Sequence, residues 1–365
     1  MQSKQNSSEA PQASAERRVR DHGASALHWT EHREAASAYW QPRLLHILFR
    51  LLPAPLLRCL AFPVAFVYFL TAHKARIESR RYLDRVAAFR DQNKVSGGGK
   101  LSVLKHITAF ALAIVEKVEA WGGKIDFKRV HFQDDDIGGL LELLEKGGGA
   151  VLLCSHLGNT ELLRALADYS RTGVSRNIPV ISVIDAKVTP FFSRMLGELN
   201  PRSLLRVLGV RDLNAGAVQL LGGHLGAGGL AVIAADRTPP PDHSAPDTGV
   251  GAAAGRERHR PFSISFLGGT AQFPLGPFVL ASLLDAPVYA VFALRQGDLS
   301  VSPEYNMHVR RVVMTGDTPR RGRLERAARE FALLLESHCL EHPYQWYNFF
   351  DFWRPHGSPQ PERRG

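Results

Sequence analysis

Short apolar runs that alternate with helical stretches constrain the fold of this 365-residue chain more than any other feature. Residues 150–154 (AVLLC) follow a glycine-rich turn, a pattern typical of a buried strand. Further runs of this kind occupy residues 179–184, 229–234 and 287–294. Helices are expected at residues 101–121, 160–169, 214–225 and 323–340. This alternation predicts an α/β fold, with a mixed sheet flanked by helices.

The chain is expected to have four parts. Residues 1–28 are predicted to be a disordered tail, because they are polar and lack the apolar core of a secretory signal. Residues 29–120 are predicted to be a helical, membrane-associating region. Residues 121–355 would form the α/β domain, and residues 356–365 a second tail.

The expectation of membrane contact rests on residues 44–70, which are almost entirely apolar. The cleanest run of this region, 59–72, has 14 residues without a charge, whereas a membrane span needs about 20. An interfacial or re-entrant helix is therefore favoured over a tilted single span. A basic stretch follows, which would attract anionic lipid head groups; its cations are Lys74, Arg76, Arg80, Arg81, Arg85 and Arg90. The alternative is a core helix followed by a solvated basic helix.

The net charge of +10 suits an anionic membrane surface or an acidic carrier protein. Neither zinc-finger spacing nor an aromatic-and-basic RNA-binding motif is present, so no nucleic-acid partner is expected. The three cysteines, Cys59, Cys154 and Cys339, lie far apart in sequence. This spacing argues against a disulfide framework and against a thiolate metal site. We expect no metal ion and no cofactor.

The segment at residues 151–163 (VLLCSHLGNTELL) is the most informative for chemistry. His156 lies in the turn beyond the strand, where α/β folds place ligands. Gly158 and Asn159 are turn formers, and Glu161 begins the next helix. A carboxylate there can accept a hydrogen bond from one ring nitrogen and make the other more basic. The alternative is a loop histidine and a solvated glutamate.

A second strand, in residues 229–237 (GLAVIAADR), ends in Asp236 and Arg237. The guanidinium is suited to binding a phosphate or a carboxylate, so both residues are candidate substrate contacts. The alternative is a structural salt bridge between them.

Residues 266–277 (FLGGTAQFPLGP) are predicted to form a glycine- and proline-rich turn. Glycine allows a ligand to approach the backbone closely. Phe266, Gly268 and Gly269 are therefore further candidate substrate contacts.

In this order, these blocks resemble the lysophospholipid acyltransferase superfamily. That superfamily carries a His-x-x-x-x-acid block, a strand ending in an acidic residue and Arg, a Phe-Leu/Pro-Gly block and a proline-containing strand. The SHLGNTE block at residues 155–161 and the ending HPYQWYNFFDFW at 342–353 resemble the lipid A biosynthesis lauroyl acyltransferase branch. The resemblance covers residues 29–353.

The resemblance implies a glycerol-3-phosphate acyltransferase-like fold and an acyltransferase of lipid biosynthesis. His156 would deprotonate a hydroxyl or amine of a lipid or glycolipid-type acceptor, which would attack a thioester on acyl carrier protein or coenzyme A. Glu161 would hold the imidazole, and the amides near Gly158 and Asn159 are candidates to stabilise the oxyanion. The enzyme would lie at the cytoplasmic face of the bacterial inner membrane, peripherally or with a single short anchor.

Two positions depart from the lauroyl branch. Thr160 stands where that branch usually has Trp, and Arg237 where it often has Gln. The arginine resembles the glycerolipid enzymes, so a lysophosphatidate-type acceptor is one alternative. A catalytically inactive membrane-surface binding protein of the same fold is another. A hydrolase is disfavoured, because the chain has no Gly-x-Ser-x-Gly elbow.

Overall fold

In the computed structural model, the residues described are 51–95, 100–121, 124–133, 136–167, 172–184, 205–209, 213–237 and 261–353. The two predicted tails, and residues 44–50 of the predicted apolar stretch, lie outside these ranges.

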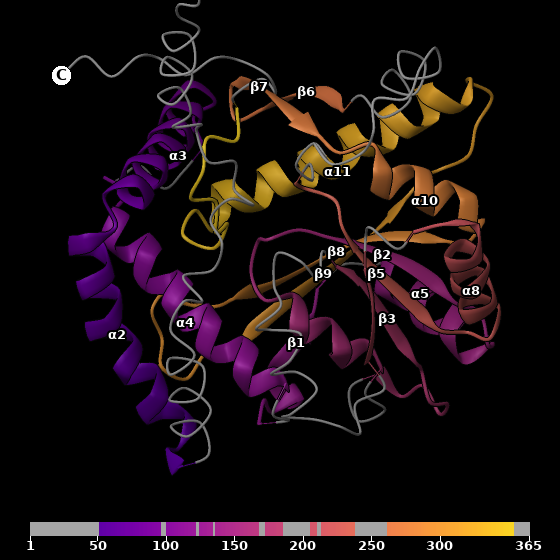
Figure 1. The fold of residues 1–365 in the computed structure, drawn as a ribbon, viewed down its shortest axis with the longest axis horizontal. Coiled ribbons are helices and arrows are strands. Elements are labelled where there is room, and N and C mark those ends of the chain that lie inside the picture. The colour runs from indigo at the N-terminus through magenta and orange to yellow at the C-terminus, as the bar shows by residue number, and fades with distance from the viewer. Residues whose placement is uncertain are drawn as a thin grey trace, which may run out of the picture.

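Three helices form the N-terminal part of the described chain: α2 (Ala54–Thr71), α3 (His73–Gln92) and α4 (Val103–Trp121). Helices α2 and α4 run side by side at one edge of the molecule (Figure 1). Helix α3 is not merely a solvated basic helix, because Tyr82, Leu83 and Val86 on it are buried in the main hydrophobic core.

Helix α2 has one face bound to the protein and an exposed apolar face. The guanidinium of Arg58 is buried, forms an ion pair with Glu119 of α4 and donates 2.8 Å to the carbonyl of Val301. On the exposed face, Val64 and Val67 are 64% and 60% accessible. By length and composition α2 is able to cross a membrane. Only 22% of the helix is buried within the protein, so most of its apolar surface is not covered by the core.

The central sheet has seven strands, in the order β1-β9-β8-β2-β5-β3-β4. Their bounds are β1 (Val130–Phe132), β2 (Ala150–Cys154), β3 (Val180–Ile184), β4 (Leu205–Gly209), β5 (Leu230–Ala234), β8 (Val288–Arg295) and β9 (Tyr305–Val312). All neighbours are parallel except β8 and β9, which are antiparallel. The predicted α/β class with a mixed sheet is confirmed.

Hydrophobic cores cover both faces of this sheet. Strand β2 is buried along its whole length: Val151 and Leu153 face one core, and Leu152 and Cys154 face the other. This alternation follows from the two-residue period of a strand, and burial on both faces explains the continuous apolar run.

The remaining elements form the layers around the sheet (Figure 1). Helix α5 and η2 pack on one face, whereas α8, α10, α11 and the separate antiparallel hairpin β6–β7 join the core on the other. Their bounds are η1 (Phe127–Arg129), α5 (Asp136–Glu145), η2 (Thr160–Ala167), α8 (Ala215–Gly226), β6 (Phe262–Phe266), β7 (Gly269–Phe273), α10 (Gly276–Leu284) and α11 (Arg320–Glu341). The predicted helix after β2 is thus the 3₁₀ helix η2.

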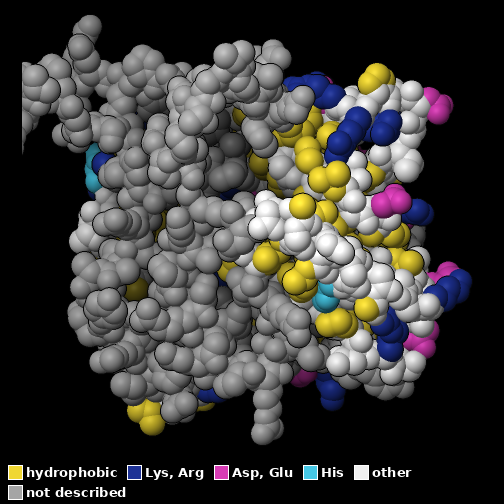
Figure 2. Space-filling model, turned by 45° about the vertical axis from the view of Figure 1, so that its right-hand side comes forward, with side chains coloured by type: hydrophobic (Ala, Val, Ile, Leu, Met, Phe, Trp, Pro, Cys, Tyr) yellow, Lys and Arg dark blue, Asp and Glu magenta, His cyan; other side chains and the backbone are white. Residues whose placement is uncertain are grey.

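Hydrophobic side chains are also visible on the outer surface seen in Figure 2. Leu220 of α8 and Leu283 of α10 are each 52% exposed. Helices α8 and α10 pack against each other, so the two leucines belong to one surface. This surface is a second exposed apolar surface, with which the exposed face of α2 can be compared.

Candidate active site

The site is built where β2 and β5 end side by side. The two strands are parallel neighbours, and Cys154 pairs with Ala234 at their last position. His156 and Asp236 each follow two residues later, so their side chains meet at the carboxyl edge of the sheet. The His156 Nδ1 lies 2.9 Å from Asp236 Oδ1, and the His156 backbone N–H donates 2.9 Å to Oδ2.

Asp236 is fully buried and accepts a third hydrogen bond, from the Trp346 indole N–H at 3.2 Å. Burial alone would raise the pKa of this carboxyl, but the interactions with His156 and the charge of Arg237 hold it well below its usual value. An ionised Asp236 requires a proton donor at Nδ1. The lone pair of the neutral imidazole is therefore on Nε2.

The imidazole remains accessible, since 36% of the His156 side chain is exposed. Burial and the positive charge of Arg237 lower the pKa of His156, and the charge of Asp236 opposes this shift without reversing it. A lowered pKa keeps the ring neutral at physiological pH, which is the state that a general base requires.

The predicted partner of His156, Glu161, makes no hydrogen bond or ion pair with the ring among the described residues. Its backbone N–H instead donates 3.1 Å to the Asn159 side-chain oxygen, at the start of η2. The carboxylate at Nδ1 is therefore Asp236 rather than Glu161, whereas a role of Glu161 in catalysis stays a prediction. The physical reason is strand order: sequence spacing suggested Glu161, but pairing of β2 with β5 brings Asp236 to Nδ1.

The two amides expected to stabilise an oxyanion are already hydrogen-bonded within the protein. Gly158 N–H donates 2.9 Å to the Gln345 carbonyl, and Asn159 N–H donates 3.0 Å to the Ala293 carbonyl. Gly158 has φ +69°, and a Cβ there would overlap the Ala293 carbonyl oxygen. These residues fasten the His156 loop to β8, and their amides are not free for a substrate.

The C-terminal segment, residues 342–353, holds the other side of this loop. Tyr347 N–H donates 3.3 Å to the His156 carbonyl, and Leu157 and Trp346 form an antiparallel bridge. Gln345 is fully buried and exchanges two side-chain hydrogen bonds, of 2.8 and 2.7 Å, with the backbone of Arg295. The sequence resemblance had identified this segment but gave it no role.

Arg237 also engages the C-terminal segment. Its guanidinium donates 2.7 Å to the Tyr347 carbonyl and lies 5.3 Å from the centre of the Phe350 ring. Burial lowers the pKa of Arg237 to about 10, against the opposing charge of Asp236. Because β2 and β5 are parallel neighbours, Arg237 lies at the same edge of the sheet as His156, whereas binding of an acceptor anion stays a prediction.

The glycines of the predicted turn lie in a tight hairpin between β6 and β7. Phe266 ends β6 and is fully buried against Trp346, with ring centres 5.3 Å apart. Gly268 has φ +70° in the hairpin turn, and Gly269 begins β7 where Arg85 approaches it closely. Phe266 and Gly269 thus pack against the C-terminal segment and α3, and the contact of these residues with substrate stays a prediction.

Lys117 of α4 was not predicted from the sequence. It is half-buried, and its charge acts on His156 and Asp236. Three charged residues, Glu116, Lys117 and Glu119, interrupt the apolar stretch ALAIVEKVEAW, and this is the signal that sequence reasoning could have used.

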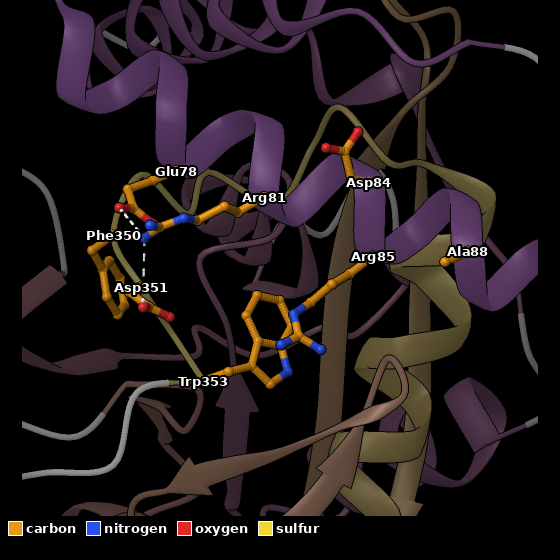
Figure 3. A pocket seen from close by; sticks show the side chains of 8 residues that line it. All are labelled: Glu78, Arg81, Asp84, Arg85, Ala88, Phe350, Asp351 and Trp353. Atoms are coloured by element: carbon orange, nitrogen blue, oxygen red, sulfur yellow. Dashed lines mark hydrogen bonds and ion pairs between the residues drawn. The ribbon is translucent and has the colours of Figure 1, made fainter. Parts of the chain in front are cut away.

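A cavity of about 500 Å³ lies between α3 and the end of the C-terminal segment. Arg81 pairs with Glu78 at 2.9 Å and with Asp351 at 3.6 Å. Arg85 lies over the Trp353 ring, as the close view of the cavity shows (Figure 3). Phe350 lines this cavity and also contacts Arg237, but His156 does not line it. The cavity thus adjoins the His156 site and remains separate from it.

Among the residues that the structure describes, no group of three or more His, Cys, Asp or Glu side chains is arranged to hold a metal ion. In sequence comparisons, no protein-family model and no curated protein matches this chain.

Proposed function

We propose that this protein is an acyltransferase. It would move a fatty acyl group from a thioester of acyl carrier protein or coenzyme A to a hydroxyl or amine of a lipid or glycolipid-type acceptor. The observation that supports this most is the accessible imidazole of His156, whose Nδ1 is bound to the buried carboxylate of Asp236.

In the proposed reaction, Nε2 of His156 removes the proton from the acceptor group while that group attacks the thioester carbonyl. Asp236 fixes the tautomer and stabilises the imidazolium that forms. General base catalysis of this kind contributes about 10²–10⁴-fold to the rate. The imidazolium then returns the proton to the departing thiolate.

The nucleophile is supplied by the acceptor, because the neighbouring protein groups are unsuited to that role. Burial raises the pKa of the Cys154 thiol, so it stays protonated and unreactive. Ser155 is buried and its hydroxyl accepts from the Leu157 N–H. This arrangement favours direct transfer over a covalent acyl-enzyme and over a hydrolase.

The membrane surface is the proposed location, and helix α2 is the proposed contact. At about 1.5 Å per residue, 18 residues span about 27 Å, slightly less than the hydrocarbon core of a bilayer. A spanning α2 would also carry the Arg58–Glu119 pair and the adjoining α4 into hydrocarbon. An interfacial position, with Val64 and Val67 inserted and the basic residues of α3 near the head groups, avoids this cost.

A glycerolipid-type acceptor is the second candidate. Its phosphate would be matched by Arg237, which lies beside His156, although that guanidinium also binds the Tyr347 carbonyl. The third candidate, an inactive membrane-surface binding protein, gives no reason for the His156–Asp236 pair.

A transfer assay tests the proposal. Purified protein is incubated with acyl carrier protein or coenzyme A thioesters of several chain lengths, together with lipid extract, lysophosphatidate or a glycolipid acceptor. Mass spectrometry then identifies acylated products. We expect an acylated acceptor that requires His156, with His131→Ala as the control for loss of an exposed histidine. The absence of any acylated product across all combinations would overturn the proposal.

A further inference from the structure

An acyl transfer at His156 needs a group that stabilises the oxyanion of the tetrahedral intermediate. The backbone N–H groups of Gly158 and Asn159 do not meet this need, because each donates to a protein carbonyl. Two cationic side chains, Arg237 and Lys117, have charges that act at His156. The Arg237 guanidinium is bound to the Tyr347 carbonyl.

The second cation, Lys117, lies on a face of α4 that contacts the C-terminal segment. His106 Nε2 lies 3.0 Å from the Trp346 carbonyl, and the Phe110 ring lies 5.5 Å from that of Tyr347. Lys117 is seven residues beyond Phe110, which places it two turns further on the same side of the helix. Helix α4 also packs against η2, the element that starts directly after the His156 loop.

The charge of Lys117 is influenced by burial and by the site residues around it. Burial lowers the pKa of its ammonium, and the negative charge of Glu161 is the largest influence that opposes this shift. The charge of Lys117 in turn lowers the pKa of His156. Lys117 makes no hydrogen bond or ion pair with the part of the chain that the structure describes. A half-buried ammonium with no partner among the described residues is well suited to an anion that forms only during the reaction.

We propose that the Lys117 ammonium is the group that stabilises the oxyanion formed from the thioester carbonyl. This inference rests on the proposed acyl transfer. The acceptor oxygen or nitrogen bonds to the carbonyl carbon, its proton passes to Nε2 of His156, and the carbonyl electron pair moves onto the oxygen facing Lys117. On collapse the C=O bond re-forms, the C–S bond breaks, and the thiolate leaves with the proton from His156.

A structural role for Lys117 predicts a different result. If the ammonium only balances the charge of Glu161, removing both charges together restores kcat. If it binds the oxyanion, the double variant stays as slow as the single one, because the developing negative charge still lacks its partner.

The kinetic experiment measures kcat and KM for wild type, Lys117→Met, Lys117→Arg and the double variant Lys117→Met/Glu161→Gln. We expect K117M to lower kcat by about 10²–10³-fold with little change in KM, since the lost contact exists only in the transition state. K117R should retain part of the activity. Lys105→Met, which removes an exposed lysine from the same helix, is the control. Wild-type kcat in K117M, or recovery in the double variant, would overturn the inference and leave the acyltransferase proposal standing.

A second readout is independent of turnover. NMR titration of the His156 ring in the full-length protein should show a higher pKa in K117M than in wild type, and an unchanged pKa in K105M. An unshifted His156 in K117M would place Lys117 too far from the site and overturn the inference. If K117M does not fold, Lys117→Gln replaces it in both measurements. If wild type transfers no acyl group to any acceptor, the proposed function and this inference fall together.

Discussion

His156 and Asp236 occupy equivalent positions on neighbouring strands: each is the second residue beyond the Cα pair of Cys154 and Ala234. The register of β2 and β5 therefore brings the imidazole and the carboxylate to 2.9 Å without a long loop. Because both positions follow strands buried in the sheet, the geometry of the pair is fixed by the core of the fold.

This pairing predicts different effects for the two acidic residues. Asp236→Asn should lower kcat by about 10²-fold or more, since an amide does not stabilise the imidazolium or enforce the Nδ1–H tautomer. Glu161→Gln should cost less than about tenfold, because Glu161 does not contact the ring. Steady-state kinetics of both variants with one donor and one acceptor measures this. A larger loss in E161Q than in D236N would restore Glu161 as the orienting residue.

The pH dependence of kcat/KM should report the titration of His156. A general base works only when neutral, so activity falls as the pH drops through its pKa. Burial and the charge of Arg237 lower that pKa, which moves the fall in activity below the ordinary value of about 6.5. The profile should be recorded from about pH 4.5 to about pH 8, spanning this value. A midpoint above that of an ordinary histidine would contradict the electrostatics of the site.

Gly158→Ala should destabilise the protein and reduce activity together. The substitution places a Cβ against the Ala293 carbonyl and strains a residue at φ +69°. Gly173→Ala is a matched control, because Gly173 has φ +70° with no atom within 4 Å of an added Cβ. The difference in unfolding free energy between the two variants isolates the overlap with β8. Equal melting temperatures would show that the loop is able to move away from Ala293.

Membrane association should depend on the exposed face of α2. The double variant Val64→Glu/Val67→Glu puts two charges on that face and should reduce sedimentation with vesicles containing anionic lipid. Leu220→Glu/Leu283→Glu, on the α8–α10 surface, is the control and should sediment as wild type does. These variants are preferable to deletion up to residue 100, because that deletion removes core residues Tyr82 and Leu83. Unchanged sedimentation of the α2 variant would assign membrane contact elsewhere.

The sequence predicted the buried strands well because their signal is local. Apolar runs marked β2, β3, β5 and β8, whose residues lie in the interior of the sheet. Strand β9 (YNMHVRRV) was missed because half of its residues are polar and face outward. The β6–β7 hairpin was predicted only as a glycine- and proline-rich turn, because its glycines mark the turn and its short strands are not distinctive.

The site was predicted in part. His156 and the Asp236–Arg237 strand end were identified from single segments, but their pairing depends on β2 lying next to β5 across 80 residues of chain. The places of Lys117 and of the C-terminal segment in the site depend on how α4 packs against η2 and against that segment. Sequence spacing within one segment carries no information about either contact, and this is why Glu161 was chosen as the partner of His156.

The central claim, that His156 is the general base of an acyl transfer, is tested most directly by kcat of His156→Ala with a thioester donor and a working acceptor. Circular dichroism and a melting curve check that the variant is folded, which we expect because the partly exposed ring contributes little to the core. The account predicts a loss of about 10²–10⁴-fold in kcat. A folded H156A that keeps more than about a tenth of wild-type kcat would contradict it.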